Sequence, residues 1–144
     1  MTRISGSGIA VDVPSGWDGR IYTRGRGDEA VLHLASFALP TGVGDYGGGA
    51  VEQMTNRDLL VVLMEHGASS VGTPLFASAG MPRLTIDDVS TTCLQRLIEG
   101  QGGAQRFFTV GNRAFCLYVV FGSYARRVRT LPMVNNILKS VTIG

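Results

Sequence analysis

The chain has 144 residues, with 13 Lys and Arg against 11 Asp and Glu, so its formal net charge is +2. With 44% hydrophobic and 17% charged residues, it is too apolar and too weakly charged for an intrinsically disordered protein. Its 20 Gly, 5 Pro and 2 Cys fit neither a collagen repeat nor a disulfide scaffold. The length predicts a single domain, residues 1–144, with a self-sufficient core.

Short apolar runs between glycines predict the first strands. Residues 8–14 predict a strand that ends at a proline, and the polar–apolar alternation over 20–24 predicts a half-exposed second strand. Glycines favour a turn over 25–28. Residues 30–39 predict a third strand, which Pro40 stops.

A glycine-rich segment, residues 41–50, follows the third predicted strand. Residues 42–47 match the pattern G-x-G-x-x-G, which in dinucleotide-binding proteins turns directly from a strand into a long helix. Here Pro40 and Thr41 intervene, and no convincing helix follows. The segment is therefore predicted to be a loop without nucleotide chemistry.

The segment 58–66 is the main ambiguity, because six consecutive apolar residues have no period that separates strand from helix. The run is short, contains two adjacent valines and ends at Gly67, so we predict a buried strand. A helix over 51–66 is the alternative, since leucine and methionine favour helices.

The next segments combine irregular structure with a hairpin. Residues 67–90 are predicted to be irregular apart from a helical turn over 86–89, followed by a strand over 91–99 and a loop over 100–103. The clearest signal is Gly111-Asn112 between two β-rich runs, which predicts a tight hairpin. The runs that it joins are residues 105–110 and 113–121.

A C-terminal helix is predicted, with Pro132 at its first position. One apolar stripe recurs at helical spacing: Leu131, Val134, Ile137, Leu138 and Val141. Three polar residues lie off this stripe: Asn135, Asn136 and Lys139. Residues 141–143 add a final extended segment. The predicted fold is α+β: a mostly antiparallel sheet of about six strands with the C-terminal helix packed on it.

Histidines and cysteines are the first candidates for chemistry. His33 and His66 have no third ligand at a metal-binding spacing, so both are interpreted as structural. A register in which 91–99 pairs with 105–110 places Cys93 and Cys116 on opposite sheet faces, so both thiols are predicted to stay reduced. No catalytic residue, metal site or cofactor is predicted.

The densest positive charge is at Arg126, Arg127 and Arg129, which are predicted to lie in a surface connection before the helix. Arginine binds phosphate in a bidentate manner, so these three are the candidate anion-binding residues. A solvated loop is the competing interpretation. Nucleic acid is not the expected partner, because aromatic residues do not alternate with the basic ones.

Motifs along most of the chain carry a resemblance to short proteins of high-GC actinobacteria, a family without an assigned activity. The residues that carry it are 11–17, 45–47, 104–108, 113–120 and 134–141. More distantly, Val13–Trp17 and Ile137–Ile143 resemble the PsbP-like α/β/α fold, whose members are mostly non-enzymatic accessory or binding proteins. That resemblance implies a further helix around 50–66.

These observations favour a non-enzymatic binding or accessory module. The alternative is a small-molecule-binding protein or small enzyme whose site is not readable from the sequence. Another protein or a second copy of the chain is the expected partner. No secretory signal and no apolar run of about 20 residues is visible, so a cytoplasmic location without a membrane span is expected.

Overall fold

The computed structural model describes residues 1–25 and 29–144. Within these ranges, eight strands form two antiparallel sheets beside one α-helix. The elements are β1 (Thr2–Gly6), β2 (Ile9–Val13), β3 (Asp18–Arg24), β4 (Glu29–Ala35), β5 (Leu59–His66), β6 (Gly102–Val110), β7 (Arg113–Phe121), α1 (Arg127–Ser140) and β8 (Thr142–Ile143). Short 3-10 helices are η1 (Val51–Gln53), η2 (Ala68–Ser70), η3 (Pro74–Phe76) and η4 (Ile86–Asp88).

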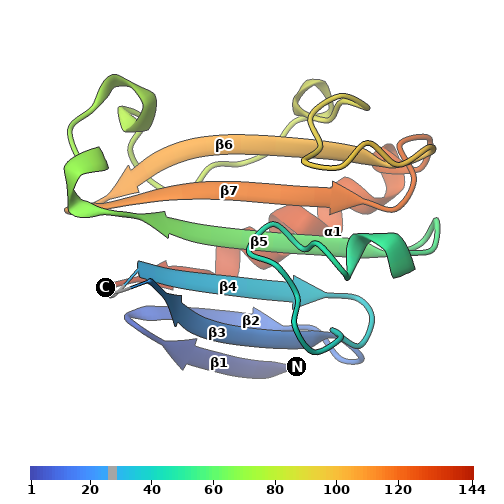
Figure 1. Ribbon diagram of the computed structural model, residues 1–144, viewed down its shortest axis with the longest axis horizontal. Coiled ribbons are helices and arrows are strands. Elements are labelled where there is room, and N and C mark those ends of the chain that lie inside the picture. The colour runs from blue at the N-terminus through green and yellow to red at the C-terminus, as the bar shows by residue number, and fades with distance from the viewer. Residues whose placement is uncertain (26–28) are drawn as a thin grey trace.

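The α+β class is confirmed, but the predicted single sheet of about six strands is two sheets. The larger has five strands in the order β3-β4-β5-β7-β6, and the smaller has three in the order β1-β2-β8. Figure 1 shows the five strands stacked across the molecule, with β6 at one edge and β3 at the other. Within the described residues, no helix is long and apolar enough to cross a membrane.

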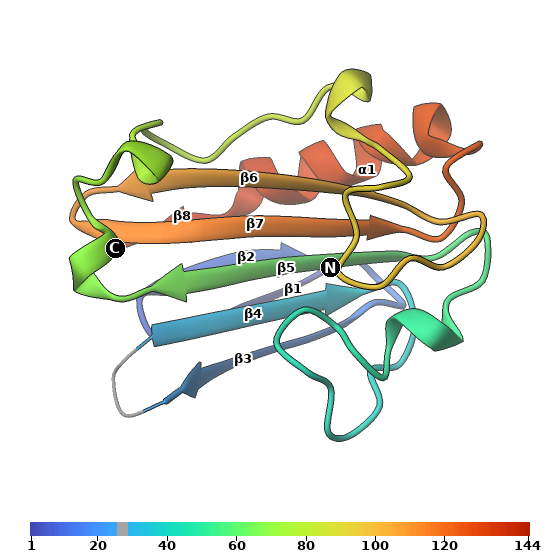
Figure 2. The same cartoon turned by 45° about the horizontal axis from the view of Figure 1, so that its top comes forward.

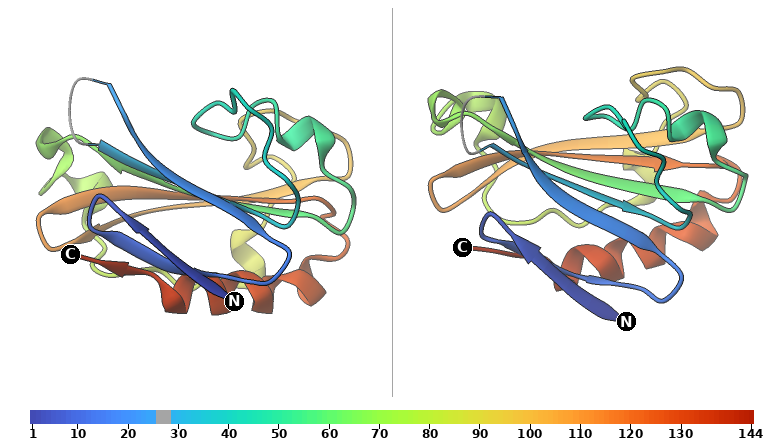
Figure 3. Two further views of the ribbon diagram at one scale, coloured as in Figure 1. Left: turned by 90° about the horizontal axis from the view of Figure 1, so that it is seen from below. Right: turned by 60° about the horizontal axis from the view of Figure 1, so that its bottom comes forward.

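The two faces of the five-stranded sheet are covered differently. Helix α1 and the small sheet cover one face, where Leu32, Val61 and Val119 join the main core. Figures 2 and 3 show the helix on this side and the connection between β4 and β5 on the other. We call the other side the loop face; it is the side of Val31, Met64 and Cys116, which lie opposite one another on successive strands.

The predicted strand over 58–66 is confirmed as β5, and the helix over 51–66 is wrong. The run is continuously apolar because β5 is a central strand with both faces covered, so Leu60, Val61 and Val62 are all buried. Only η1 (Val51–Gln53), a single turn, is helical in the preceding residues.

The predicted hairpin is also confirmed. Strands β6 and β7 meet across Gly111-Asn112, and Phe107 lies opposite Cys116, as the two-residue turn requires. Gly111 has a φ of 61°, a left-handed conformation that glycine adopts without steric cost.

Strands β3 and β4 begin before the predicted positions, and β4 ends at Ala35 instead of residue 39. The strand predicted at 8–14 is β2. Residues 26–28 of the predicted turn lie outside the described residues. Strand β1 was not predicted, because Thr2–Gly6 is short and largely exposed and contains a single large apolar residue, Ile4.

The strand predicted over 91–99 is wrong. Ser90, the residue before this segment, bridges to β6, where it exchanges two backbone hydrogen bonds with Gly103. The following residues then turn over the loop face, and Leu94 and Ile98 pack against its buried side chains. Their spacing of four residues serves this packing, whereas a strand would need alternation. Strand β6 starts at Gly102, inside the predicted loop 100–103.

Helix α1 begins at Arg127, so Pro132 lies inside the helix instead of at its first position. The predicted stripe is buried at Leu131, Val134, Ile137 and Leu138. Asn135 was predicted to lie off the stripe, but its side chain is buried. It accepts a hydrogen bond from the backbone N–H of Leu84 and donates one to the carbonyl of the same residue, both at 2.9 Å. This pair of bonds fixes the 67–90 segment to the helix.

Candidate functional site

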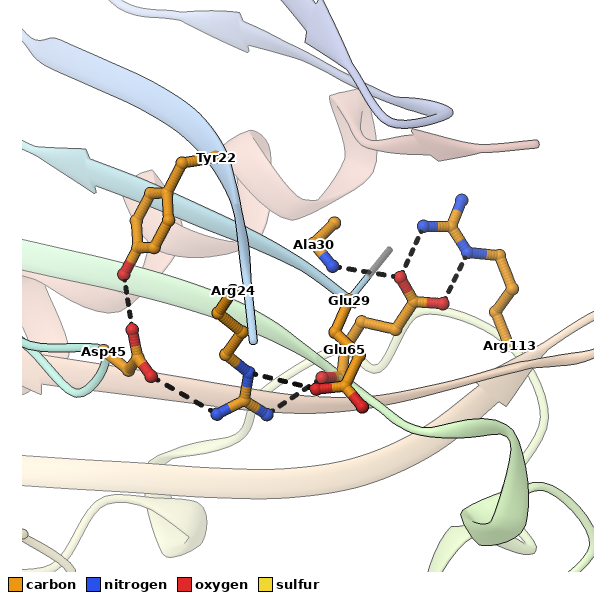
Figure 4. Close-up of polar contacts among 7 residues, drawn as sticks. All are labelled: Tyr22, Arg24, Glu29, Ala30, Asp45, Glu65 and Arg113. Carbon is orange, nitrogen blue, oxygen red and sulfur yellow. Dashed lines mark hydrogen bonds and ion pairs between the residues drawn. The ribbon is translucent and has the colours of Figure 1, made fainter. Parts of the chain in front are cut away.

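The glycine-rich segment 41–50 lies over the loop face and is anchored there by Asp45. Its carboxylate accepts a hydrogen bond of 2.7 Å from the Tyr22 hydroxyl and forms an ion pair of 3.3 Å with Arg24 (Figure 4). The carbonyl of Asp45 lies 2.9 Å from Nε2 of the buried His33. Three side chains of β3 and β4 therefore hold one residue of the loop.

Arg24 links this anchor to the neighbouring strands. Its guanidinium also donates to the carbonyl of Glu65 at 3.0 Å and lies 3.6 Å from the carboxylate of Glu29. Arg24 and Tyr22 are two residues apart on β3, so both side chains point to the same face of the sheet. The alternation that predicted a half-exposed strand over 20–24 was the signal for this shared face.

Burial sets the protonation of the anchor. Burial raises the pKa of Tyr22, and the Asp45 carboxylate raises it further, so the hydroxyl remains a donor. Burial lowers the pKa of His33 and keeps the imidazole neutral. Because Nε2 faces a carbonyl oxygen, the proton belongs on Nε2 and the imidazole donates to Asp45. No proton transfer is needed to form this anchor.

Beside the anchor, a cavity of about 220 Å³ lies between segment 41–53 and the loop 94–101. We call it the loop cavity. Nine residues line it: Tyr46, Gly48, Val51, Leu94, Gln95, Arg96, Gln101, Tyr118 and Val120. The rings of Tyr46 and Tyr118 meet edge-on, with centroids 5.4 Å apart. The wall is thus mostly apolar and aromatic, with few polar groups.

Two polar side chains of the loop cavity are fixed by backbone groups. The Tyr118 hydroxyl accepts a hydrogen bond of 2.8 Å from the N–H of Gln95. The Gln101 amide donates a hydrogen bond of 2.9 Å to the carbonyl of Val51. The Gln101 side-chain oxygen, Oε1, is buried and has no hydrogen-bond partner among the described residues. Burial raises the pKa of Tyr118, so its hydroxyl stays neutral.

A second polar cluster lies at the same end of the sheet as Arg24, but on the helix side. The carboxylate of Glu65 accepts bidentate hydrogen bonds from Arg113 at 2.8 and 2.9 Å and a third from the N–H of Ala30 at 3.1 Å (Figure 4). Burial raises the pKa of Glu65, but the hydrogen bonds outweigh it and the net pKa is lowered. The pair joins β5 to β7 and β4, a structural role.

The three candidate arginines were predicted to lie in the connection before the helix; Arg126 does lie there, whereas Arg127 and Arg129 belong to α1. Arg126 is the residue before the helix, and Arg127 and Arg129 lie in its first turn. The Arg127 guanidinium stacks on the Tyr124 ring, 3.8 Å from its centroid, and donates to the carbonyl of the same residue. This stacking ties Arg127 to the turn before the helix. Anion binding by the three residues stays a prediction.

The remaining candidates have structural surroundings. His66 packs against the ring of Phe76 at 5.1 Å, and His33 serves the anchor. Cys93 and Cys116 are both free thiols. The register predicted for Cys93 was wrong, because residues 91–99 form no strand. Across the described part of the chain, no three His, Cys, Asp or Glu side chains gather as a metal site would require.

The glycine-rich segment is a loop that no long helix follows, as predicted; only the single turn η1 comes after it. The segment also forms a wall of the loop cavity. Comparisons with protein-family models, curated proteins and solved structures gave no match. The function must therefore be argued from the geometry of the site.

Proposed function

We propose that the protein is a non-enzymatic binding module that holds a small molecule in the loop cavity. The observation that carries this proposal is the cavity itself, about 220 Å³ of space whose lining includes Tyr46, Tyr118 and Gln101. Binding sites for small molecules are typically apolar and aromatic, with a few polar groups that orient the ligand. The loop cavity has this composition.

The volume limits the size of the ligand. An apolar cavity of about 150 Å³ accommodates benzene. A cavity of about 220 Å³ therefore has room for a single substituted ring, but not for a nucleotide or a peptide. A one-ring molecule is the size class that we propose.

Binding is favoured over catalysis because the charged groups in and beside the cavity are already engaged. Arg96, which is part of the lining, pairs with Glu52. Asp45 accepts from Tyr22 and pairs with Arg24, and both contacts hold the loop. The Cys116 thiol on the same face is buried, and burial raises its pKa, which disfavours the nucleophilic thiolate. These groups support the position of the cavity wall instead of presenting an acid, a base or a nucleophile.

The resemblance to the PsbP-like fold, whose members are mostly accessory and binding proteins, stays a prediction, and the further helix that it implies around 50–66 is replaced by strand β5. The partner proposed for the loaded protein is another protein or a second copy of the chain. The cytoplasmic location and the resemblance to the actinobacterial family stay predictions.

The proposal is tested by titrating ¹⁵N-labelled protein with toluene and, separately, with phenol, and recording amide chemical shifts. Binding should shift the amides of Tyr46 and Gln101 in a saturable manner. Leu94→Trp places a larger ring in the cavity wall and should abolish the shifts. Leu97→Trp, three residues further along the same loop and 69% exposed, is the matched control and should leave them unchanged.

Two results would overturn the proposal. The first is the absence of saturable shifts at the cavity with both probes up to their solubility limits. The second is equal binding by the two tryptophan variants, which would place the probe elsewhere on the surface.

A further inference from the structure

We infer that β3 (Asp18–Arg24), at one edge of the five-stranded sheet, pairs with β3 of a second copy of the chain. The two strands run antiparallel about a twofold axis at Ile21, so that the large sheets of the two copies form one continuous sheet. The inference commits the partner to a second copy. No residue of β3 lines the loop cavity, so dimer formation and ligand binding are separate properties.

The outer edge of β3 carries backbone groups without partners among the described residues. The N–H of Ser36 donates to the carbonyl of Leu59, so the even-numbered residues of β4 bond with β5 and the odd-numbered ones with β3. The odd-numbered residues of β4 lie opposite the even-numbered residues of β3. The N–H and carbonyl groups of Gly19, Ile21 and Thr23 therefore point outward, and no described residue bonds to them.

The opposite edge of the same sheet, at β6, is covered instead. There the backbone of Thr109 bonds with Ser78 and Gly80, and the backbone of Gly103 bonds with Ser90. No segment of the described chain does the same for β3. The left panel of Figure 3 looks onto the β3 edge and shows this strand in front of the other strands of its sheet. Strand β3 is therefore the open edge of the large sheet.

The side chains of β3 leave this edge unprotected. Native proteins commonly protect an edge strand with outward charged side chains, prolines or bulges. Strand β3 pairs with β4 over seven consecutive positions without a proline or a bulge. Its polar side chains are held over the loop face, where Arg20 donates to the carbonyl of Leu39 and both Tyr22 and Arg24 bind Asp45. An incoming strand meets bare backbone.

Charge selects one register for the pairing. With Ile21 opposite Ile21 of the second copy, all the outward residues of both strands lie opposite one another and can exchange hydrogen bonds. Asp18 then lies opposite Arg24 of the second copy, and Arg20 lies opposite Tyr22. A shift of two residues in one direction places Arg20 opposite Arg20, and a shift in the other places Arg20 opposite Arg24. Like charges directly opposite one another are destabilising, so only the centred register fits.

The pairing is tested first with the wild-type protein without any ligand, from about 10 µM to about 1 mM. Sedimentation velocity should show a reversible monomer–dimer equilibrium. Hydrogen exchange at the amides of Gly19, Ile21 and Thr23 should slow as the dimer forms. Exchange at Ser5, on the edge strand β1 of the small sheet, should stay the same at all concentrations.

Thr23→Pro removes an outward N–H from an exposed residue and leaves the bonds to β4 in place. It should weaken the dimer at least about tenfold, because the twofold axis doubles the loss. Ser5→Pro is the matched control at the other open edge, and it should leave the dimer unchanged. Asp12 of β2 donates its N–H to Ser140, away from β1, so Ser5, opposite another even-numbered residue of β2, also points its N–H outward.

Asp18→Asn tests the register, because it keeps an oxygen for the N–H of Leu39 and removes the charge opposite Arg24. Two such pairs form in each dimer, so the variant should dimerise about fivefold more weakly. Asp87→Asn is the control, because it removes the same charge from an exposed residue of η4, far along the chain from β3. It should leave the dissociation constant of the dimer unchanged.

Four results would count against the inference. A protein that stays monomeric up to about 1 mM would overturn it. A dimer without slower exchange at the three β3 amides would also overturn it, even if Thr23→Pro did not fold. A dimer lost in Ser5→Pro but kept in Thr23→Pro would move the contact to β1. Equal dissociation constants for Asp18→Asn and Asp87→Asn would refute the register. A β3 dimer in a protein that binds neither toluene nor phenol would overturn only the proposed function.

Discussion

Replacing Gly47 with alanine should cost about 2–4 kcal/mol of unfolding free energy, because two separate effects act at this residue. Gly47 has a φ of 85°, and an alanine in this left-handed conformation is strained by about 1–2 kcal/mol. The lower entropy of the unfolded alanine chain offsets about 0.4–1 kcal/mol of that strain. The second effect is steric, because an added Cβ would collide with Cδ2 of the buried Leu60. Overpacking of this kind costs about 1–3 kcal/mol.

Gly49→Ala isolates the first effect. Gly49 has a similar φ of 93°, but an added Cβ there meets no atom within 4 Å. Its expected cost is therefore about 1 kcal/mol, the strain less the entropy gain. The difference between the two variants measures how closely the glycine-rich segment approaches β5.

Urea unfolding of both variants, with the wild type as reference, gives the two free energies. Amide exchange at Ala50, whose N–H donates to the Gly47 carbonyl, reports whether the segment lifts from the sheet. Faster exchange only in Gly47→Ala is expected. Surface substitutions commonly change the unfolding free energy by up to about 0.5 kcal/mol. If the unfolding free energies of the two variants agree within that range, the close approach of Gly47 to Leu60 is refuted.

Three further predictions concern protonation and the start of the helix. Burial lowers the folded pKa of His33, so the unfolded chain binds the proton first and stability should fall as pH drops below 6.5. His33→Gln should reduce the dependence of the unfolding free energy on pH between pH 7 and 5. If urea unfolding shows the same pH dependence in this variant as in the wild type, His33 is not its source. The lowered pKa of Glu65 likewise gives stability that is lost as pH falls below 4.5, and Glu65→Gln should remove this dependence while costing about 3 kcal/mol at pH 7. A melting temperature of Glu65→Gln that equals that of the wild type at pH 7 would contradict this prediction. Arg127→Gln should cost about 1 kcal/mol, because it removes the stacking on Tyr124, whereas the exposed Arg129→Gln should stay within about 0.5 kcal/mol. Equal urea midpoints for the two arginine variants would show that the stacking contributes nothing.

The elements that could be predicted are those whose signal is local. The apolar run of β5, the Gly111-Asn112 turn and the apolar stripe of α1 each determine structure within a few residues. The segment 91–99 was misassigned because its apolar residues pack onto a sheet face formed by distant strands. Nothing within that segment distinguishes a residue that pairs with a strand from one that covers it.

The candidate site could not be predicted for the same reason. Gln101 and Val51 are 50 residues apart, and the Tyr22 hydroxyl meets Asp45 across 23 residues. Each residue alone has an ordinary structural interpretation. Only the antiparallel pairing of β3, β4, β5 and β7 brings these side chains to the loop face. The G-x-G-x-x-G pattern at 42–47 lies in the segment that forms one wall of the cavity. The pattern itself is typical of dinucleotide binding, which needs a long following helix that this fold does not have.

The arrangement of charge on the loop face gives a physical reason for keeping the anchor and the cavity apart. Asp45 and Tyr46 are adjacent, yet the first meets the polar side chains of β3 and the second meets Tyr118 in the loop cavity. A carboxylate inside the cavity would lose its hydration whenever an apolar molecule filled the cavity, at a cost that apolar contacts could not recover. At the edge of the sheet, the Arg24 side chain is 27% exposed, so water and its carboxylate partners share the stabilisation of its charge. The segment is thus held by charges that lie outside the lining of the cavity, whose one charged residue, Arg96, is exposed and paired with Glu52.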